Sequence, residues 1–219
     1  MSDWLLLDWH KGLGDAIACN GLVRCLIKKG ERLTLPCHAR NYESICAMFS
    51  DISTNQLTID PGEIVNDHAK MAAMGYRILH LGFAGKDFDG YRWDESFYRQ
   101  AGVPFIEKWN SFELGVSGII GATECGGMKT FIHDDHSRGY RIPLHGIRPN
   151  PQYAAITEWV ETLMHCDEIH CINSCFAILA DLIKAPGKLF LHAYARPNSP
   201  LPIFGQHWTV LQSASEIPN

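Results

Sequence analysis

Short apolar segments alternate along the chain with segments whose apolar residues recur at helical spacing. Residues 4–9 (WLLLDW) have the composition of a buried parallel strand, and residues 16–29 carry apolar side chains at positions 18, 22, 25 and 26, as a helix does. Further strands are predicted at 32–36, 56–59 and 77–81, and further helices at 42–49 and 63–74. This alternation predicts a parallel sheet with right-handed crossovers.

The alternation stops after the fourth predicted strand and then starts again. Residues 82–94 are glycine-rich and charged, residues 96–101 form a predicted short helix, and residues 115–127 are again rich in glycine. Beyond them we predict strands at 129–133, 168–172, 188–191 and 208–211, and helices at 154–164 and 174–183. We therefore expect an α/β chain with two small Rossmann-like units, residues 1–90 and 128–219, joined by a linker at 91–127.

Composition excludes several classes of protein. The chain has 219 residues, 46% of them apolar and 20% charged, which is typical of a globular protein. A net charge of −5 argues against non-specific binding of nucleic acid. No apolar stretch is long enough for a transmembrane helix, and the N-terminus lacks the features of a signal peptide, so we expect a cytoplasmic protein. The eight cysteines form no CxxC pair, so we expect reduced thiols and no metal site.

The first candidate site is the segment His10–Asp15 (HKGLGD), between the first predicted strand and helix. Gly12 and Gly14 permit a tight turn, and we expect Asp15 at the N-cap of the helix. Asp15 has two interpretations, a capping residue or a general base held at a cleft, and His10 is grouped with it as a candidate catalytic residue. The pattern GxGxxG is absent, which disfavours binding of a dinucleotide.

Three further candidate segments follow strands of the second unit. His133, Asp134 and Arg138 lie in HDDHSR, where an arginine is suited to a phosphate and its neighbours to orienting a sugar; a solvated loop and a metal site are the alternatives. Asn173, Ser174 and Cys175 begin a predicted helix, whose free amides are also suited to a phosphate, although an ordinary N-cap explains them equally well. Arg196 follows the next strand and adds a second cation. Neither a GxSxG elbow nor a phosphate-binding P-loop is present.

Taken together, these segments resemble the heptosyltransferase-like glycosyltransferases (family 9-like) and related bacterial and viral sugar transferases. The first strand followed by HKGLGDAIA is similar to the strand–GLGD–helix opening of that family. FIHDDHSR and EIHCINSCFAILA resemble its donor-binding half, and residues 97–112 its interdomain segment. The resemblance covers about two thirds of the chain in patches.

The resemblance implies a minimal GT-B fold, with two Rossmann-like units facing across a cleft. It implies a cytoplasmic bacterial or phage enzyme that transfers a sugar from a nucleotide sugar to a hydroxyl of a glycan, a lipid-linked sugar, a protein or a modified DNA base. Asp15 would be the base, and Arg138 with Asn173 and Ser174 would hold the donor. Since such enzymes do not generally need a metal, we expect no cofactor besides the nucleotide sugar as co-substrate.

The sequence departs from the family in three ways. The chain is short, its C-terminal tail is too short for the usual crossing helix, and Arg138 stands where the family has a lysine. A nucleotide- or sugar-phosphate-binding protein without catalysis is the principal alternative, and it would not need Asp15. Self-association into a homo-oligomer is left open.

Overall fold

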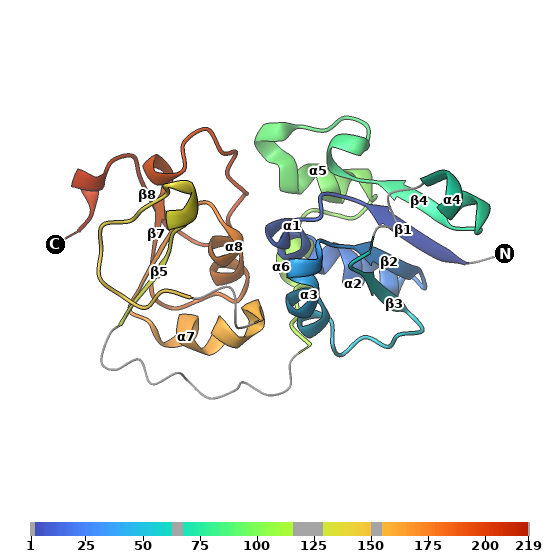
Figure 1. Cartoon of the computed structure of the whole chain (residues 1–219), viewed down its shortest axis with the longest axis horizontal. Helices are drawn as coiled ribbons and strands as arrows, with labels where there is room; N and C mark the ends of the chain where they lie inside the picture. The colour runs from blue at the N-terminus through green and yellow to red at the C-terminus, as the bar shows by residue number, and fades with distance from the viewer. Residues whose placement is uncertain (1–2, 63–67, 116–128, 150–154, 219) are drawn as a thin grey trace. The chain divides into compact units, whose positions relative to one another are not determined.

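The structure is a computed structural model that describes the chain except for residues 1–2, 63–67, 116–128, 150–154 and 219. It divides into two compact units, Met1–Val116 and Ser117–Asn219, each with its own parallel sheet (Figure 1). The predicted α/β class with two Rossmann-like units is therefore confirmed. Most of the glycine-rich connection at 115–127 lies outside the described residues.

Unit 1 is built on a four-stranded parallel sheet in the order β3-β2-β1-β4. Its strands are β1 (Trp4–Asp8), β2 (Arg32–Pro36), β3 (Leu57–Asp60) and β4 (Arg77–His80), close to the predicted ranges. Leu5, Leu6 and Leu7 are consecutive and all buried, so the central strand β1 is covered on both faces. The helices are α1 (Leu13–Ala18), α2 (Asn20–Lys28), α3 (Tyr42–Met48), α4 (His68–Ala73), α5 (Trp93–Gln100) and α6 (Glu107–Asn110).

The single helix predicted over 16–29 is two helices that meet at Cys19. The hydroxyl of Tyr98 lies at this break, where it donates to the carbonyl oxygen of Ala18 at 2.9 Å and accepts from the amide of Leu22 at 3.1 Å. The hydroxyl thus supplies partners for backbone groups at the break. Tyr98 comes from α5, so a long-range contact decides a local feature that helical periodicity alone does not predict.

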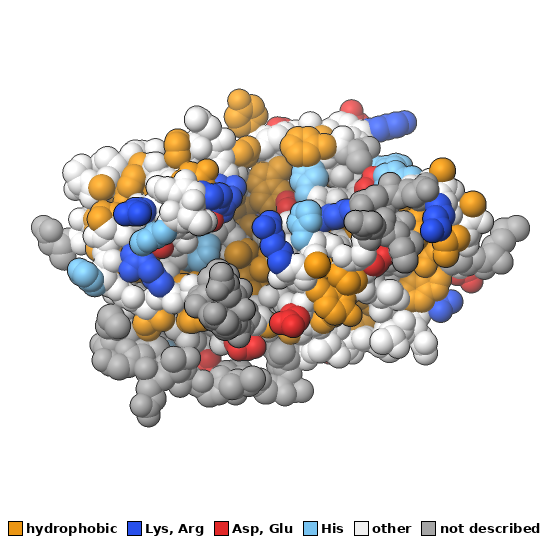
Figure 2. Space-filling view, viewed as in Figure 1, with side chains coloured by type: hydrophobic (Ala, Val, Ile, Leu, Met, Phe, Trp, Pro, Cys, Tyr) orange, Lys and Arg blue, Asp and Glu red, His pale blue; other side chains and the backbone are white. Residues whose placement is uncertain are grey.

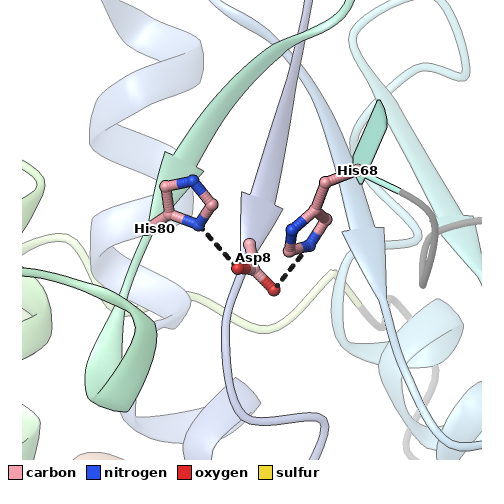
Figure 3. A group of neighbouring side chains, drawn as sticks. All are labelled: Asp8, His68 and His80. Carbon is pink, nitrogen blue, oxygen red and sulfur yellow. Dashed lines mark hydrogen bonds and ion pairs between the residues drawn. The ribbon is translucent and has the colours of Figure 1, made fainter. Parts of the chain in front are cut away.

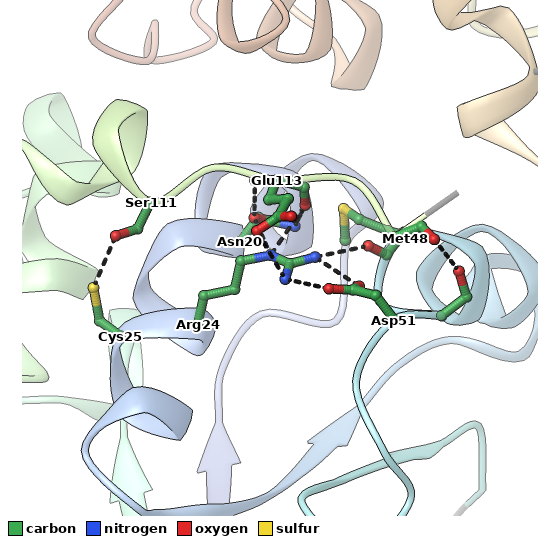
Figure 4. A network of polar contacts seen from close by, with 9 residues as sticks. Asn20, Arg24, Cys25, Met48, Asp51, Ser111 and Glu113 are labelled. Carbon is green, nitrogen blue, oxygen red and sulfur yellow. Dashed lines mark hydrogen bonds and ion pairs between the residues drawn. The ribbon is translucent and has the colours of Figure 1, made fainter. Parts of the chain in front are cut away.

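A polar network around Arg24 joins α2 to the last described residues of unit 1 (Figure 4). Arg24 is 6% exposed, and its guanidinium donates to both carboxylate oxygens of Asp51 at 2.8 and 2.9 Å. Its Nε donates to the side chain of Asn20 and to the carbonyl of Glu113, and the Asn20 amide donates to that same carbonyl at 3.0 Å. This network fastens the segment after α6 to the unit.

Residues 91–115, expected in a linker, pack against unit 1. Phe97 and Tyr98 of α5 are fully buried. Gly21 of α2 has no room for a side chain, because a Cβ atom there would collide with the backbone carbonyl of Glu107 in α6. A buried ion pair between Asp94 and Lys108, 2.7 Å long, joins α5 to α6. Residues 91–115 are therefore part of unit 1, and no boundary between compact units lies at residue 90.

Unit 2 contains a four-stranded parallel sheet in the order β5-β6-β7-β8. Its strands are β5 (Thr130–His133), β6 (Glu168–Cys171), β7 (Lys188–His192) and β8 (Trp208–Leu211), and its helices are α7 (Val160–His165) and α8 (Cys175–Leu182). The helix predicted over 154–164 begins, within the described residues, as a 3₁₀ turn at Ile156–Trp159 and continues as α7.

Side chains of opposite charge are interspersed on the face drawn in Figure 2, together with several histidines. The cysteines of the described part are free thiols. None of the helices in the described ranges combines the length and apolar character that a membrane span requires.

Candidate functional site

The strand order of unit 1 reverses direction between β1 and β4, which places a topological switch point there. Ligands of open α/β sheets bind at the carboxyl ends of strands beside such a point. The segment after β1 is HKGLGD, and the segment after β4 begins Leu81-Gly82-Phe83. The first sequence-predicted site therefore lies where this topology places a ligand.

His10 and Asp15 are brought together in unit 1. The Nδ1 atom of His10 lies 3.7 Å from Oδ1 of Asp15, and both side chains are partly exposed. Nε2 of His10 accepts a hydrogen bond from the backbone amide of Phe83 at 3.1 Å. In the neutral imidazole Nε2 is then the acceptor, so Nδ1 carries the proton and directs it toward Asp15.

Aromatic rings hold the imidazole of His10 in this position. Its ring stacks on Phe83 at 4.4 Å between centroids and meets the edges of Phe97 and Phe88 at 5.2 and 5.8 Å. Gly82 has φ of +67°, and a Cβ atom there would collide with His10 and Phe97. The turn after β4, through Gly82 and Phe83, thus fixes both the orientation and the tautomer of His10.

The N-cap of α1 is Gly12, so the expected N-cap position of Asp15 is wrong. Asp15 lies in the first turn, where a carboxylate interacts favourably with the helix dipole. Gly12 and the Asp15 carboxylate are so close that a Cβ atom at position 12 would collide with Oδ2 of Asp15. Gly14 lies inside the first turn of α1. Glycine at position 12 is needed for space and not for backbone angles, because its φ is −72°.

In unit 2, the two predicted cations Arg138 and Arg196 both lie beside the aromatic ring of Tyr140. Tyr140 was not among the residues predicted from the sequence. The guanidinium carbon of Arg138 lies 5.2 Å from the ring centroid of Tyr140, and that of Arg196 lies 6.0 Å from it. Arg138 is largely exposed, and its Nε donates to Asp135 at 2.6 Å. Arg196 donates to the backbone carbonyl of Asn173.

The start of α8 lies beside these cations. Ser174 is its N-cap, but its side chain makes no capping hydrogen bond, and its buried Oγ has no hydrogen-bond partner within the described part of the chain. Asn173 instead donates its side-chain amide to Ser199 at 2.9 Å and to the carbonyl of Pro200 at 2.7 Å, which positions the following loop. Burial raises the pKa of the Cys175 thiol to about 11, although Arg196 and Arg138 lower it, so the thiol is protonated.

His133 and Asp134 play different parts at the end of β5. Burial lowers the pKa of His133 to about 4, so its imidazole is neutral, and its Nδ1 has no hydrogen-bond partner among the described residues. Asp134 holds Arg148 through both carboxylate oxygens at 3.2 and 3.3 Å and also accepts from the amide of Ile142. Hydrogen bonds from Ile142, Arg148 and His136 hold the pKa of Asp134 low despite its burial. Asp134 is therefore occupied in shaping the loop.

Sequence reasoning missed a chain of hydrogen-bonded side chains in unit 2, formed by two buried histidines and a half-buried tyrosine. Nδ1 of His170 lies 2.9 Å from Nε2 of His192, whose Nδ1 lies 3.0 Å from the hydroxyl of Tyr194. Burial lowers the pKa of both histidines, that of His192 to about 4. The signal was available, because β6 and β7 are adjacent and both carry histidine, but only the register of the two strands reveals the contact.

Sequence reasoning also missed a group of potential metal ligands in unit 1. Asp8, His68 and His80 each offer one ligand atom, and these atoms lie within 4.8 Å of one another (Figure 3). Two imidazoles and a carboxylate suit a divalent first-row transition metal, including Fe²⁺.

Comparison with solved structures identifies proteins of similar fold. The structure of the iron-containing dodecameric glycosyltransferase TibC from enterotoxigenic E. coli H10407 matches 97% of this chain with a TM-score of 0.56 and 14% identity. The dodecameric iron-containing heptosyltransferase TibC in complex with ADP-D-beta-D-heptose matches 94% with a TM-score of 0.52 and 13% identity. The chain spans 66% and 63% of those two solved chains.

The fold is the one seen in these structures of the glycosyltransferase TibC. The resemblance to heptosyltransferase-like enzymes is thereby confirmed at the level of the fold. No protein-family model and no curated protein matches the sequence significantly. The expectation of a chain without a cofactor is contradicted, because both structures of similar fold are described as iron-containing. The sequence argument considered cysteine pairs, the local His/Asp set of HDDHSR and the usual metal independence of the resembling enzymes. None of these can detect ligands that separate strands bring together.

Proposed function

We propose that this protein is a glycosyltransferase that transfers a sugar from a nucleoside diphosphate sugar to an acceptor hydroxyl, and that unit 2 binds the donor diphosphate. The observation that carries the proposal is the pair of guanidinium groups beside the Tyr140 ring. One of them, Arg196, also donates a hydrogen bond to the carbonyl of Asn173, the residue before Ser174. Guanidinium groups and the free amides of a helix N-terminus are the usual partners of phosphate oxygens.

The unpartnered polar atoms at this site support an anionic ligand. A buried hydroxyl without a partner costs about 1–3 kcal/mol, so the Oγ of Ser174 is a donor kept for a ligand. Nδ1 of the neutral His133 is likewise available. Cation–π contact with the Tyr140 ring restricts both guanidinium groups, which reduces the entropy lost when they bind phosphate.

Unit 1 supplies the proposed catalytic base. Removal of a proton from the acceptor hydroxyl requires a carboxylate or imidazole at the edge of a ligand site. Asp15 meets this requirement, and Nδ1 of His10 faces the same carboxylate at 3.7 Å. We assign Asp15 as the base and His10 as the group that holds it.

The donor class is tested by calorimetry with ADP and an ADP-sugar, because one structure of similar fold is a complex with ADP-D-beta-D-heptose. Arg138→Ala and Arg196→Ala should each weaken ADP binding about 10-fold or more, the loss of one charge-assisted hydrogen bond. Lys188→Ala is the matched control, since it removes a positive charge at the opposite end of β7 in the same unit. Equal affinities in all four proteins would refute the site.

Transfer itself is tested with the ADP-sugar and four acceptor classes: a glycan, a lipid-linked sugar, a protein and hydroxymethylated DNA. Sugar transfer to any of them supports the proposal. Tight ADP binding without transfer or donor hydrolysis would favour the alternative of a nucleotide-binding protein without catalysis.

We also propose a homo-oligomer, because both structures of similar fold are described as dodecameric. Light scattering across a range of protein concentrations tests this part, and a constant monomer mass would contradict it.

A further inference from the structure

We infer that Asp8, His68 and His80 form a binding site for one divalent transition metal ion. The three residues come from the end of β1, the start of α4 and the end of β4 (Figure 3). Their ligand atoms lie within 4.8 Å of one another. This site is defined by side chains of unit 1 alone and does not depend on the proposed sugar transfer.

The geometry of the group is that of converging ligands. Nδ1 of His80 lies 2.7 Å from Oδ2 of Asp8, and Nε2 of His68 lies 3.3 Å from Oδ1 of the same carboxylate. The two imidazoles therefore approach one carboxylate from two sides. Ligand atoms of a tetrahedral ion lie about 3.4 Å apart at usual bond lengths, so small side-chain rotations bring all three onto one ion.

The backbone holds two of the three ligands in fixed positions. Asp8 and His80 are directly paired in adjacent parallel strands, and the amide of Leu81 donates to the carbonyl of Asp8 at 2.8 Å. Ligands on paired strands are positioned more exactly than ligands on loops. His68, on the connection between β3 and β4, completes the set.

Exposure and chemistry both favour a transition metal with open coordination positions. The side chains of His68 and His80 are 43% and 47% exposed, and that of Asp8 is 19% exposed, so an ion can enter and retain water ligands. Two imidazoles and one carboxylate select Fe²⁺, Co²⁺ or Zn²⁺ over Mg²⁺ and Ca²⁺, which prefer oxygen ligands.

A metal in this site would join α4 and β4 to β1 at the carboxyl ends of the strands, next to the segment His10–Asp15. It would therefore stabilise unit 1, since only the folded chain brings the three ligands together. Amide exchange at the ends of β1 and β4 and at the start of α4 should slow when the ion binds.

The test uses the full-length chain stripped with a chelator and titrated separately with Zn²⁺, with Fe²⁺ under anaerobic conditions, and with Co²⁺ as a spectroscopic probe. We expect one equivalent of tightly bound metal and a raised Tm. The cobalt spectrum should lack the near-ultraviolet band of thiolate ligation. Mg²⁺ should not compete.

Asp8→Asn, His68→Ala and His80→Ala should each weaken binding at least about 10-fold, which is the smallest usual effect of losing even an outer-shell partner. His136→Ala is the matched control, because His136 also pairs with a carboxylate, Asp134, at 3.0 Å, and it should bind metal like the wild type. Circular dichroism checks that each variant folds, and Asp8→Asn preserves the shape of the side chain.

Three results would overturn the inference, and the first two are no stoichiometric metal in the wild type and metal retained in all three ligand variants. The second result would assign the ion to other groups, such as the free cysteines. The third result is an amide exchange that slows elsewhere in unit 1 but not at these three segments, which would place the ion at another site.

Discussion

Nδ1 of His10 lies 3.7 Å from Oδ1 of Asp15, while the opposite nitrogen of the same ring accepts the amide hydrogen of Phe83. His10, two residues after the end of β1, is thus oriented by the backbone of Phe83, which lies in the 3₁₀ turn Gly82–Ala84 that follows β4. The loops after β1 and β4 thereby together set the geometry of the pair His10 and Asp15. This arrangement places a ring nitrogen beside a carboxylate that stays partly exposed.

The first prediction concerns the carboxylate of this pair. If Asp15 is the base, Asp15→Asn should lower turnover about 100-fold or more, because the amide cannot accept the proton. Affinity for ADP should be unchanged, since the proposed diphosphate site is in unit 2. Steady-state kinetics and calorimetry on the same preparation measure both. Glu43→Gln, which neutralises an exposed carboxylate in α3, is the control, and a wild-type rate in Asp15→Asn would refute the role.

The second prediction tests the space around Asp15. Gly12→Ala should displace the Asp15 carboxylate and lower turnover in the same direction as Asp15→Asn, with little change in Tm, because φ of −72° suits alanine. The control is Gly90→Ala, whose Cβ would meet only ordinary contact at 3.9 Å. Equal turnover in the two glycine variants would show that the position of Asp15 does not matter.

The third prediction concerns the stability of unit 1. Arg24→Met should lower the free energy of unfolding by about 2–3 kcal/mol. The carboxylate of Asp51, the side-chain oxygen of Asn20 and the carbonyl of Glu113 all lose a charged hydrogen-bond donor. Arg77→Met removes an exposed ion pair with Glu31 and should cost less than about 1 kcal/mol. Chemical denaturation of both variants gives the comparison, and equal losses would contradict the importance of the buried network.

The Arg24 network also has a pH dependence. The hydrogen bond from Arg24 lowers the pKa of Asp51 below its usual value. The stabilisation is therefore present at neutral pH and is lost as the pH falls through the range where carboxylates protonate. The difference in stability between the wild type and Arg24→Met should shrink at acidic pH.

The fourth prediction concerns mild acid and unit 2. Burial lowers the pKa of His133 and of His192 from 6.5 to about 4, so between these values the unfolded chain binds protons that the folded chain does not. Stability should therefore fall as the pH falls from about 6.5 toward 4, by about 2 kcal/mol per imidazole at pH 4.5. Chemical denaturation across this range measures the loss.

His192→Gln provides the test of that assignment. Glutamine can still form hydrogen bonds with His170 and Tyr194 but does not titrate. The loss of stability between pH 7 and pH 4.5 should be smaller in this variant by about the contribution of one histidine. An identical pH dependence in the variant and the wild type would exclude His192 as a source.

Much of the fold could be predicted because its signals are local. The apolar run of β1, the helical spacing in α2 and the limits of β2 and β8 follow from short stretches of sequence. The break at Cys19 could not be predicted, because it depends on a hydroxyl from α5, far along the chain.

The candidate site divides in the same way. The segment HKGLGD and the arginines Arg138 and Arg196 could be recognised as candidates, because residue type and position after a strand are visible in the sequence. The roles of Asp134 and Asn173 could not, since their hydrogen bonds to Arg148, Ser199 and Pro200 depend on how loops fold back.

The sequence by itself determined the α/β class and which segments follow the strands, because periodicity and turn residues act within a few positions of the chain. Only the tertiary structure decided which of these segments meet. Strand register pairs Asp8 with His80, and the connection between β3 and β4 brings His68 to them. Residues 8, 68 and 80 share no local pattern, and a site made by long-range contacts leaves none, because convergence depends on the order and register of strands.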